Sequence, residues 1–409
     1  MSQKLSRRVI LGAAAAAGAV PLAIHLLRPA PATGPVIRLG LIAPFTGNTG
    51  AYGPDMEKAA RLTVEQINAA GGLLDGHTLE LLVEDEESSP TASVAAARKL
   101  LDVHKVAGLI GLWGSPPGLA VKPIALQYNT ALFVSCSANE LTSGDTKGLI
   151  WRFQARATHW GTVIARSMLK QGIKTVSVLA LQSPFVGSMV APFEEHFRAH
   201  GGQILETVRY NPDQPSYRAE VEQVFSKQPE AVFVPALLTD FSSIVKEVYR
   251  GGFTSKLFTL SVAADAEGKF VSGVGAEAAE GIHHFQPSPP LGSPGYQKFV
   301  KRMGARDDAL FLFAGNTHDQ VALFALAVEK ARSSAPLDYT RQILSLSNGP
   351  GEPVDDVVEA LKRVRAGQPI NFVGAGSDVD FSPTGDQLNR HFGHYVIRNG
   401  QNALVELVS

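Results

Sequence analysis

The side chains most suited to chemistry in this sequence are serine hydroxyls and one thiol that follow short apolar runs. Ser115 lies in Trp113-Gly114-Ser115-Pro116-Pro117-Gly118, and Ser135-Cys136-Ser137 follows a second run. The first stretch is not G-x-S-x-G, and the two prolines are expected to prevent the helix that must directly follow a nucleophilic serine of that type. The sequence designates no base for these groups. We therefore expect hydroxyls that bind a ligand and no catalytic residues, with Cys136 as a small buried apolar group.

Two histidine pairs could suggest a metal site. His283 and His284 are adjacent on a predicted strand, so their rings point to opposite faces and do not share one metal. His391 and His394 lack a nearby third ligand and are expected to form a surface pair. We expect neither a metal nor a cofactor.

A glycine-rich loop, residues 47–53, follows the first apolar run and precedes an amphipathic segment. A Walker loop needs Gly-Lys-Ser/Thr at its end, whereas this chain has Tyr52-Gly53-Pro54-Asp55, and Asp55 would repel a phosphate. The spacing does not fit G-x-G-x-x-G either. Two interpretations stay open: a plain strand–helix turn, or a turn whose amides and Tyr52 face a ligand.

Length and composition favour a globular protein with two domains. The chain has 409 residues, of which 45% are hydrophobic and 18% charged, enough for two cores. Without residues 1–32 it carries 33 basic and 38 acidic residues, a net charge of −5. This mild acidity argues against nucleic acid or an anionic membrane as the partner.

The first 32 residues have the pattern of an export signal. Lys4, Arg7 and Arg8 precede an apolar stretch, residues 9–27, and Ala30-Pro31-Ala32 provides an A-x-A cleavage sequence. The stretch from Ser6 resembles a twin-arginine signal. We expect cleavage after Ala32 and a periplasmic protein; an uncleaved membrane anchor is the alternative.

Short apolar runs alternate with segments of helical periodicity through the rest of the chain, which predicts βαβ units and parallel sheets. The fold class is therefore α/β, with two doubly wound lobes, because the strands exceed what one modest sheet uses. The predicted strands cover 37–43, 79–84, 106–112, 131–135, 175–181, 204–210, 231–235 and 257–261.

An ordered set of short motifs resembles the type I periplasmic binding proteins, in the leucine/isoleucine/valine-binding branch that serves ABC importers. The resemblance spans essentially the whole chain after the signal. It is carried by IRLGLIAPFTG, YG and QINAAGG near the start, then VEDEESSPTASVAAARKLL, GLIGLWGS, ALFVSCSANELT, AAEGI and FVGAGSDVDFSPTGD. It implies two lobes joined by three crossover segments, with residues 36–155 and 285–372 in the first and 156–284 and 373–409 in the second.

The resemblance also implies a ligand site between the lobes. Ser115 matches the serine that bonds the ligand carboxylate, and Tyr52 matches an aromatic residue that packs on the ligand. Ser137 and Ala138 match the segment whose amides and hydroxyl hold the amino-acid head group.

The second lobe departs from the family pattern. Phe185, Leu237 and Leu238 replace the expected aromatic hydroxyls, and they suit a cleft or a core equally. Ala264 and Ala157 stand where the family has acids. Either Asp265 supplies the charge for an ammonium, or the ligand has no ammonium.

These observations predict a non-enzymatic, monomeric solute receptor of an ABC importer, partnered by a membrane permease. A hydrophobic or branched-chain amino acid is the first ligand class considered, and a carboxylate or amide without an ammonium is the second. Two other functions stay open. A ligand-sensing regulator of the same fold should lack the export signal, and an exported enzyme is disfavoured because no acid/base or metal set is found.

Overall fold

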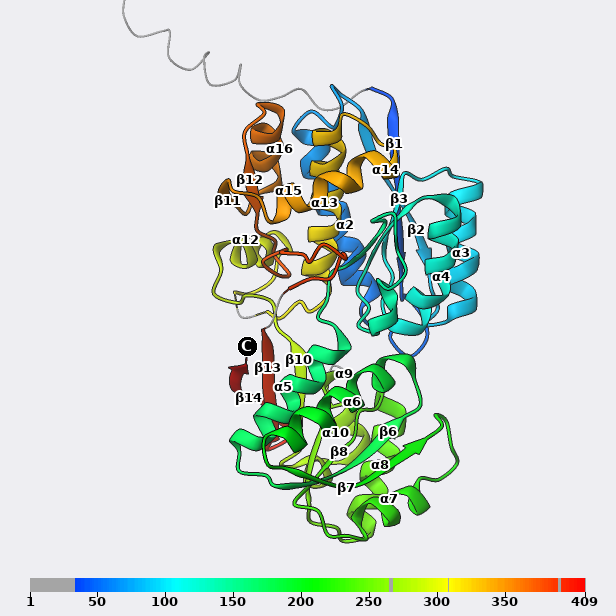
Figure 1. The fold of residues 1–409 in the computed structure, drawn as a ribbon, viewed down its shortest axis with the longest axis vertical. Helices are drawn as coiled ribbons and strands as arrows, with labels where there is room; N and C mark the ends of the chain where they lie inside the picture. Colours follow the sequence, from blue (N-terminus) through cyan, green and yellow to red (C-terminus); the bar gives the residue numbers. More distant parts are fainter. Residues whose placement is uncertain (1–33, 265–267, 308, 389–390, 409) are drawn as a thin grey trace, which may run out of the picture.

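The chain folds into two α/β lobes, stacked end to end in Figure 1. The structure is a computed structural model and describes residues 34–264, 268–307, 309–388 and 391–408. The expected export signal and Asp265 lie outside the described residues. Within them, no helix has both the length and the apolarity needed to cross a membrane.

The first lobe is built on a five-stranded parallel sheet in the order β2-β1-β3-β4-β5. Its strands are β1 (Val36–Ala43), β2 (Thr78–Asp85), β3 (Gly108–Gly111), β4 (Ala131–Val134) and β5 (Ile150–Arg152). A small parallel pair, β11 (Glu352–Val354) and β12 (Ile370–Phe372), lies in the same lobe.

Helices cover both faces of this sheet, because neighbouring residues of a strand present apolar side chains to opposite faces. Leu41 and Ile42 are adjacent on β1 but belong to different apolar clusters, since successive side chains of a strand point to opposite faces. The helices are α2 (Gly53–Ala69), α3 (Pro90–Asp102), α4 (Ser115–Tyr128), α12 (Pro294–Arg302), α13 (Ala314–Ala331), α14 (Pro336–Tyr339), α15 (Ile343–Ser347) and α16 (Val357–Arg365).

The second lobe contains a seven-stranded sheet in the order β14-β13-β10-β9-β8-β6-β7. Five strands are parallel as predicted: β6 (Thr175–Leu181), β7 (Gln203–Tyr210), β8 (Ala231–Phe233), β9 (Lys256–Leu260) and β10 (His283–Pro287). An antiparallel hairpin, β13 (Phe392–Arg398) and β14 (Gln401–Val408), extends the sheet beyond β10. This lobe is therefore a mixed sheet, not a purely parallel one.

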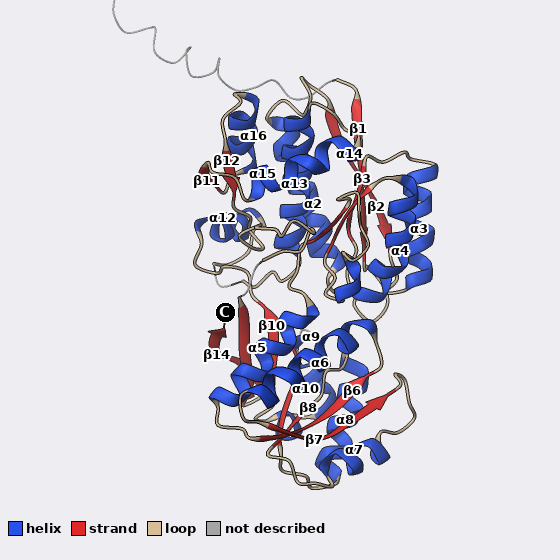
Figure 2. Ribbon diagram, viewed as in Figure 1, coloured by secondary structure: helices blue, strands red, loops and turns tan. Residues whose placement is uncertain are grey.

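Helices and strands of the second lobe alternate along the chain (Figure 2). The longest of these helices are α5 (Ala157–Lys170), α6 (Pro184–Ala199), α7 (Arg218–Phe225) and α8 (Leu238–Arg250). Shorter helices, α9 (Ser261–Ala264), α10 (Lys269–Val274) and α11 (Ala276–Ala279), fill the connection between β9 and β10.

The chain returns to the second lobe later than the sequence predicts. Val379 and Phe381 were expected in the second lobe but pack in the apolar cluster of the first, and the second sheet resumes only at Phe392. The preceding crossing is also displaced, because β10 stays in the second sheet through Pro287. Both shifts follow from sheet pairing and core contacts, which the motif order does not specify.

The two prolines after Ser115 do not prevent a helix, contrary to the sequence-based expectation. Helix α4 begins at Ser115, and the prolines occupy its first turn. Proline is compatible with that position because its fixed φ suits a helix and its missing N–H would have no intrahelical acceptor there. Gly114 makes the sharp turn from β3 with a φ of 89°, a value that favours glycine. Ser115 is thereby held at the carboxyl end of the sheet.

Candidate functional site

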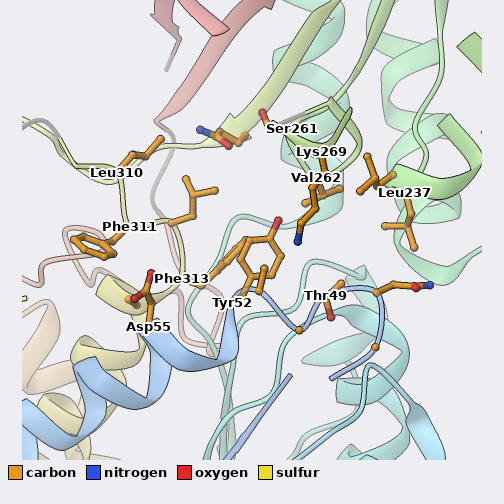
Figure 3. A pocket seen from close by; sticks show the side chains of 18 of the residues that line it. Thr49, Tyr52, Asp55, Leu237, Ser261, Val262, Lys269, Leu310, Phe311 and Phe313 are labelled. Atoms are coloured by element: carbon orange, nitrogen blue, oxygen red, sulfur yellow. The ribbon is translucent and has the colours of Figure 1, made fainter. Parts of the chain in front are cut away.

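Two adjoining cavities lie between the lobes. The outer cavity, about 410 Å³, is bordered by the loop 47–52 and residues 310–314 of the first lobe and by residues 237–239, Ser261, Val262 and Lys269 of the second. Figure 3 shows Tyr52 extending from the first lobe toward Ser261 and Val262 of the second.

The inner cavity, about 60 Å³, shares part of its wall with the outer one. The shared residues are Leu237, Val262, Gln286, Leu312 and Phe313. Its other lining residues are mostly buried and come from both lobes: Trp113, Gly114, Ser115, Ser135, Ser137, Gln154, Trp160, Phe185 and Pro287. Because they share part of their walls, the two cavities adjoin and form one cleft between the lobes.

Ser115 and Ser137 lie side by side on the wall of the inner cavity. The amides of Ser137 and Ala138 donate to Ser115 Oγ at 3.3 and 3.0 Å. The resemblance assigned these amides to a ligand; here they hold the serine instead. Because Ser115 Oγ accepts two hydrogen bonds, its proton remains available to a ligand. Ala138 is wholly buried and lines neither cavity.

Several buried polar atoms around the inner cavity have no hydrogen-bond partner within the described chain. They are Ser137 Oγ, Trp113 Nε1, Trp160 Nε1 and both amide atoms of Gln286. Each residue lines the inner cavity. An indole N–H can only donate, so donors outnumber acceptors in this set. A buried polar group without a partner is costly, so a ligand that brings acceptor oxygens would stabilise this wall.

Aromatic rings form the apolar part of the site. In the first lobe, Tyr52 contacts Trp113 and Phe313 with ring centroids 5.1 and 4.9 Å apart. In the second lobe, Trp160 packs edge-on against Phe185 at 5.5 Å. Such edge-on and tilted arrangements are the favoured geometries of aromatic pairs. The site therefore offers flat apolar walls from both lobes.

No acidic or basic side chain lines the inner cavity among the residues that the structure describes. Glu86 lies behind it, where one carboxylate oxygen accepts the Trp113 amide at 3.1 Å. Burial raises the pKa of Glu86 well above its usual value, and the amide hydrogen bond opposes this shift. Among the described lining residues, charged side chains appear only at the outer cavity, as Asp55 and Lys269.

The predicted second-lobe residues divide between the two cavities. Phe185 lines the inner cavity, Leu238 the outer cavity, and Leu237 both. All three also pack against the second core, so the two interpretations left open by the sequence are not exclusive. Ala264 and Ala157 are buried.

Sequence reasoning missed several contributors to the site, among them Trp113, Trp160, Gln286, Leu312 and Phe313. Trp113 was visible two residues before Ser115, but a tryptophan after an apolar strand is typical of a core. Gln286 follows the strand-like His-His-Phe, and its position near a crossing was the available signal. Nothing in the sequence links residues 312–313 to Ser115.

Two further expectations can be compared with the structure. Cys136 is buried, as predicted, and burial strongly raises its pKa. His394 is not part of a surface pair: it is fully buried, and its Nε2 lies 2.9 Å from His283 Nδ1. The error arises because pairing of β13 with β10 carries His394 into the interior. Within the described chain, no three His, Cys, Asp or Glu residues are grouped to hold a metal.

This architecture and sequence are similar to those of known proteins. A family model described as periplasmic binding protein matches residues 36–388. The Leu/Ile/Val-binding protein BraC3 of Rhizobium johnstonii is 22% identical over 373 residues, covering 90% of this chain and 94% of the relative.

Two solved structures illustrate the likeness in fold. The leucine binding protein LivK from Thermotoga maritima has a TM-score of 0.76 and 20% identity, covering 91% of this chain and 99% of that one. A solute binding protein of an ABC transporter from R. palustris, in complex with benzoate, has a TM-score of 0.71 and 18% identity, covering 91% and 96%. With the two lobes, the cleft and the family match, the resemblance seen in the sequence is confirmed: the chain belongs to the periplasmic binding protein family.

Proposed function

We propose that this protein is a solute receptor for a small apolar carboxylate that carries no ammonium, with aromatic acids as the leading class. The observation that carries the proposal is the excess of buried hydrogen-bond donors around the inner cavity. Ser137, Trp113 and Trp160 supply donors without partners in the described chain, and Ser115 adds a hydroxyl proton. Hydroxyl and N–H donors together stabilise a carboxylate without a cationic residue.

The neighbourhood of Ser115 disfavours an α-amino acid. In such a ligand the ammonium is attached to the carbon next to the carboxylate, so a carboxylate at Ser115 places the ammonium in the inner cavity as well. No acid lines that cavity in the described chain, and Asp55 borders only the outer one. A buried ammonium without an anionic partner is costly. The proposal therefore favours the second ligand class over the branched-chain amino acids.

The aromatic walls support the choice of aromatic acids. Tyr52, Trp113 and Phe313 on one side and Trp160 and Phe185 on the other suit a flat apolar ring. One structural neighbour, the solute binding protein from R. palustris, is in complex with benzoate, a carboxylate without an ammonium. Ligand contacts to both lobes would favour closure of the cleft by a hinge motion.

The proposal extends to the cellular setting. We infer a monomeric receptor that is exported by the signal in residues 1–32, cleaved after Ala32, and delivers its solute to a membrane permease of an ABC importer without converting it. The signal-like sequence distinguishes this role from that of a cytoplasmic regulator of the same fold. Mass spectrometry of the exported protein should give the mass of a chain that begins at Thr33; a mass that includes residues 1–32 would refute cleavage.

Thermal unfolding with matched ligand pairs tests the proposed ligand class. Each pair contains an amino acid and the same acid without its amine: leucine with 4-methylpentanoate, and phenylalanine with 3-phenylpropanoate, together with benzoate. A ligand at about a hundred times its Kd adds about 2.7 kcal/mol to the free energy of unfolding. Stabilisation by the amine-free acids is expected. Stabilisation by the amino acids alone would overturn the proposal.

A matched pair of tryptophan variants tests the role of the indole donors. Trp113→Phe keeps an aromatic ring but removes the N–H at the inner cavity, so it should weaken binding of the acids. Trp151→Phe is the control, because the Trp151 N–H already donates to the Gly148 carbonyl at 3.0 Å and its ring lies in the first core. Equal affinities of the two variants would remove Trp113 from the site.

A further inference from the structure

Ser261 stands on the second-lobe wall of the outer cavity, at the point where β9 ends and α9 begins. It is only 4% exposed, and Figure 3 shows it across the cavity from Tyr52. It shares the second-lobe wall with the apolar side chains of Leu237, Leu238 and Val262 and with the polar side chains of Thr239 and Lys269. Its hydrogen bonding therefore contributes to what this end of the cleft offers to a ligand.

Behind Ser261 a chain of two hydrogen bonds runs from the interior to an exposed residue, Asn402. Ser261 Oγ lies 2.7 Å from His284 Nδ1, and His284 Nε2 lies 2.9 Å from Asn402 Oδ1. His284 is fully buried on β10, and Asn402 belongs to the C-terminal strand β14. Burial lowers the pKa of His284 to about 4, so the ring is neutral at pH 7 and carries one N–H.

This chain fixes the direction of the Ser261 hydroxyl. An amide oxygen only accepts, so the single proton of His284 is on Nε2, facing Asn402. Nδ1 is then an acceptor, and Ser261 donates its proton to it. Toward the cavity, the Ser261 oxygen can therefore only accept a hydrogen bond. His284 itself is wholly buried behind Ser261, so it does not reach a group in the cavity, and the chain orients the serine.

Gln286 extends the polar wall toward the inner cavity. It lies two residues after His284 on β10, and residues two apart on a strand share a face. Its side chain is buried, lines both cavities, and has no partner for either amide atom in the part of the chain that the structure describes. Polar groups thus continue from the donor-rich inner end to Ser261.

We propose that Ser261, oriented by His284 and Asn402, is a specificity-determining acceptor for a hydrogen-bond donor at the end of the ligand remote from its carboxylate. The favoured solutes are then hydroxylated aromatic carboxylates, bound by their carboxylate near Ser115 and by their hydroxyl at Ser261. This inference rests on the proposed function, to which it adds a hydrogen-bond acceptor at the end of the site remote from Ser115.

A calorimetric panel on the full chain tests the inference. The probes are benzoate, 3- and 4-hydroxybenzoate, and the corresponding methoxybenzoates, in which the oxygen only accepts. One hydroxybenzoate should bind more tightly than benzoate by about two- to tenfold, the range expected for one added neutral hydrogen bond. Its methoxy counterpart should bind more weakly than benzoate, because its ether oxygen only accepts and would face the Ser261 oxygen, which also accepts.

Variants assign the preference to Ser261. Ser261→Ala should remove the advantage of the hydroxybenzoate over benzoate, measured as the ratio of the two affinities in the same variant. Ser243→Ala is the matched control, since the Ser243 hydroxyl donates to a carbonyl of its own helix, that of Thr239. Asn402→Leu frees the imidazole to carry its proton on either nitrogen and should weaken the preference. Asn402→Asp keeps the accepting oxygen and should retain it.

The outcomes separate this inference from the proposed function. If no benzoate of the panel binds, the proposed ligand class fails. If benzoate binds but no hydroxybenzoate binds better, or if the advantage persists in folded Ser261→Ala, the proposed function stands and the role of Ser261 is refuted. A preference for a methoxybenzoate would mean that Ser261 donates to the cavity, the reverse of the proton arrangement inferred here.

Discussion

Two buried polar regions, one in the first lobe and one between the lobes, differ in how their hydrogen-bonding groups are satisfied. In one, Arg152 and Asp386 form an ion pair with 2.8 Å between Nε and Oδ1; Thr142 donates to the same oxygen, and Arg152 Nη1 donates to the Cys136 carbonyl. In the other, the inner cavity, donors on Ser137, Trp113 and Trp160 have no partner among the described residues. In the first region Arg152 Nη2 alone lacks a partner among the described residues of this group, whereas we propose that a ligand satisfies the donors of the second.

The first lobe thus combines a fixed internal structure with one wall of the cleft. Arg152 and Asp386 come from distant parts of the sequence and tie β5 to the segment before the last crossing. They thereby secure the carboxyl end of the sheet, from which Ser137 projects. Stability and binding should therefore respond to different substitutions, although the regions are adjacent.

The largest expected effect is loss of stability in Asp386→Asn. Removing one partner of a buried ion pair leaves the charge of Arg152 uncompensated and should lower the free energy of unfolding by about 3–5 kcal/mol. Urea denaturation measures this change. Arg156→Gln is the control, because Arg156 is 46% exposed and lies 3.6 Å from Asp386; its loss should cost about 0–1 kcal/mol. Equal effects of the two variants would contradict the assigned role of the buried pair.

The opposite pattern is expected for Ser137→Ala. Its hydroxyl has no partner in the described chain, so the free energy of unfolding should hardly change. A lost hydrogen bond to a carboxylate corresponds to about 1.5–3 kcal/mol, or about ten- to a hundredfold in Kd. Calorimetry with an amine-free acid such as benzoate measures the change. Unchanged affinity in the folded variant would exclude Ser137 from the site.

Ser115→Ala sharpens this contrast because it should affect both properties. Its oxygen accepts the Ser137 and Ala138 amides, so its removal leaves buried donors unsatisfied, at a cost of about 1–3 kcal/mol in stability. Affinity should fall as well, since the hydroxyl proton is lost. Parallel urea and calorimetric titrations of the two serine variants would show whether only Ser115 has this double role.

The smallest expected effect is the contribution of His284, in the second lobe, to the pH dependence of the free energy of unfolding. His284 has a pKa of about 4 in the folded protein, below the ordinary 6.5. Between these two pH values the unfolded chain binds more protons than the folded one. The free energy of unfolding therefore falls as pH decreases from about 6.5 to about 4. At pH 5.5 the loss due to His284 is about 1 kcal/mol. The raised pKa values of buried Glu86 and Asp319 act in the opposite sense.

Comparison with His284→Gln therefore isolates the histidine. Glutamine does not titrate, so the difference in unfolding free energy between pH 7.5 and pH 5.5 should shift by about 1 kcal/mol relative to wild type. The same pH dependence in both proteins would show that His284 is not held neutral by burial.

The fold was largely predictable from the sequence, whereas the polar groups on the second-lobe wall of the cleft were not. Alternating apolar runs and helical segments predict the βαβ order, because each strand must be buried by its neighbours whatever the details. Ser115 and Ser137 were found because short motifs mark the loops after β3 and β4. The late crossing after Phe381 and the burial of His394 depend on long-range strand pairing, which leaves no local pattern.

Gln286 and Trp113 illustrate why the polarity of a cleft is hard to predict from sequence. A tryptophan and a glutamine near strand ends are common in cores and on surfaces. Their role emerges only when burial and missing partners are known together. Asp265, the predicted partner of an ammonium, lies outside the described residues, so the prediction that it faces the ligand remains a proposal that Asp265→Asn would test.

The most direct test of the central claim is a calorimetric titration of the wild-type protein with phenylalanine and with 3-phenylpropanoate. The two ligands share ring, chain length and carboxylate and differ in the ammonium alone. A donor-rich inner cavity with no acid among its described lining residues predicts binding of 3-phenylpropanoate and at least about a hundredfold weaker binding of phenylalanine, because the effective penalty for burying an unpaired charge is several kcal/mol. Tighter binding of phenylalanine would show that the site supplies an anion for the ammonium and would contradict the account.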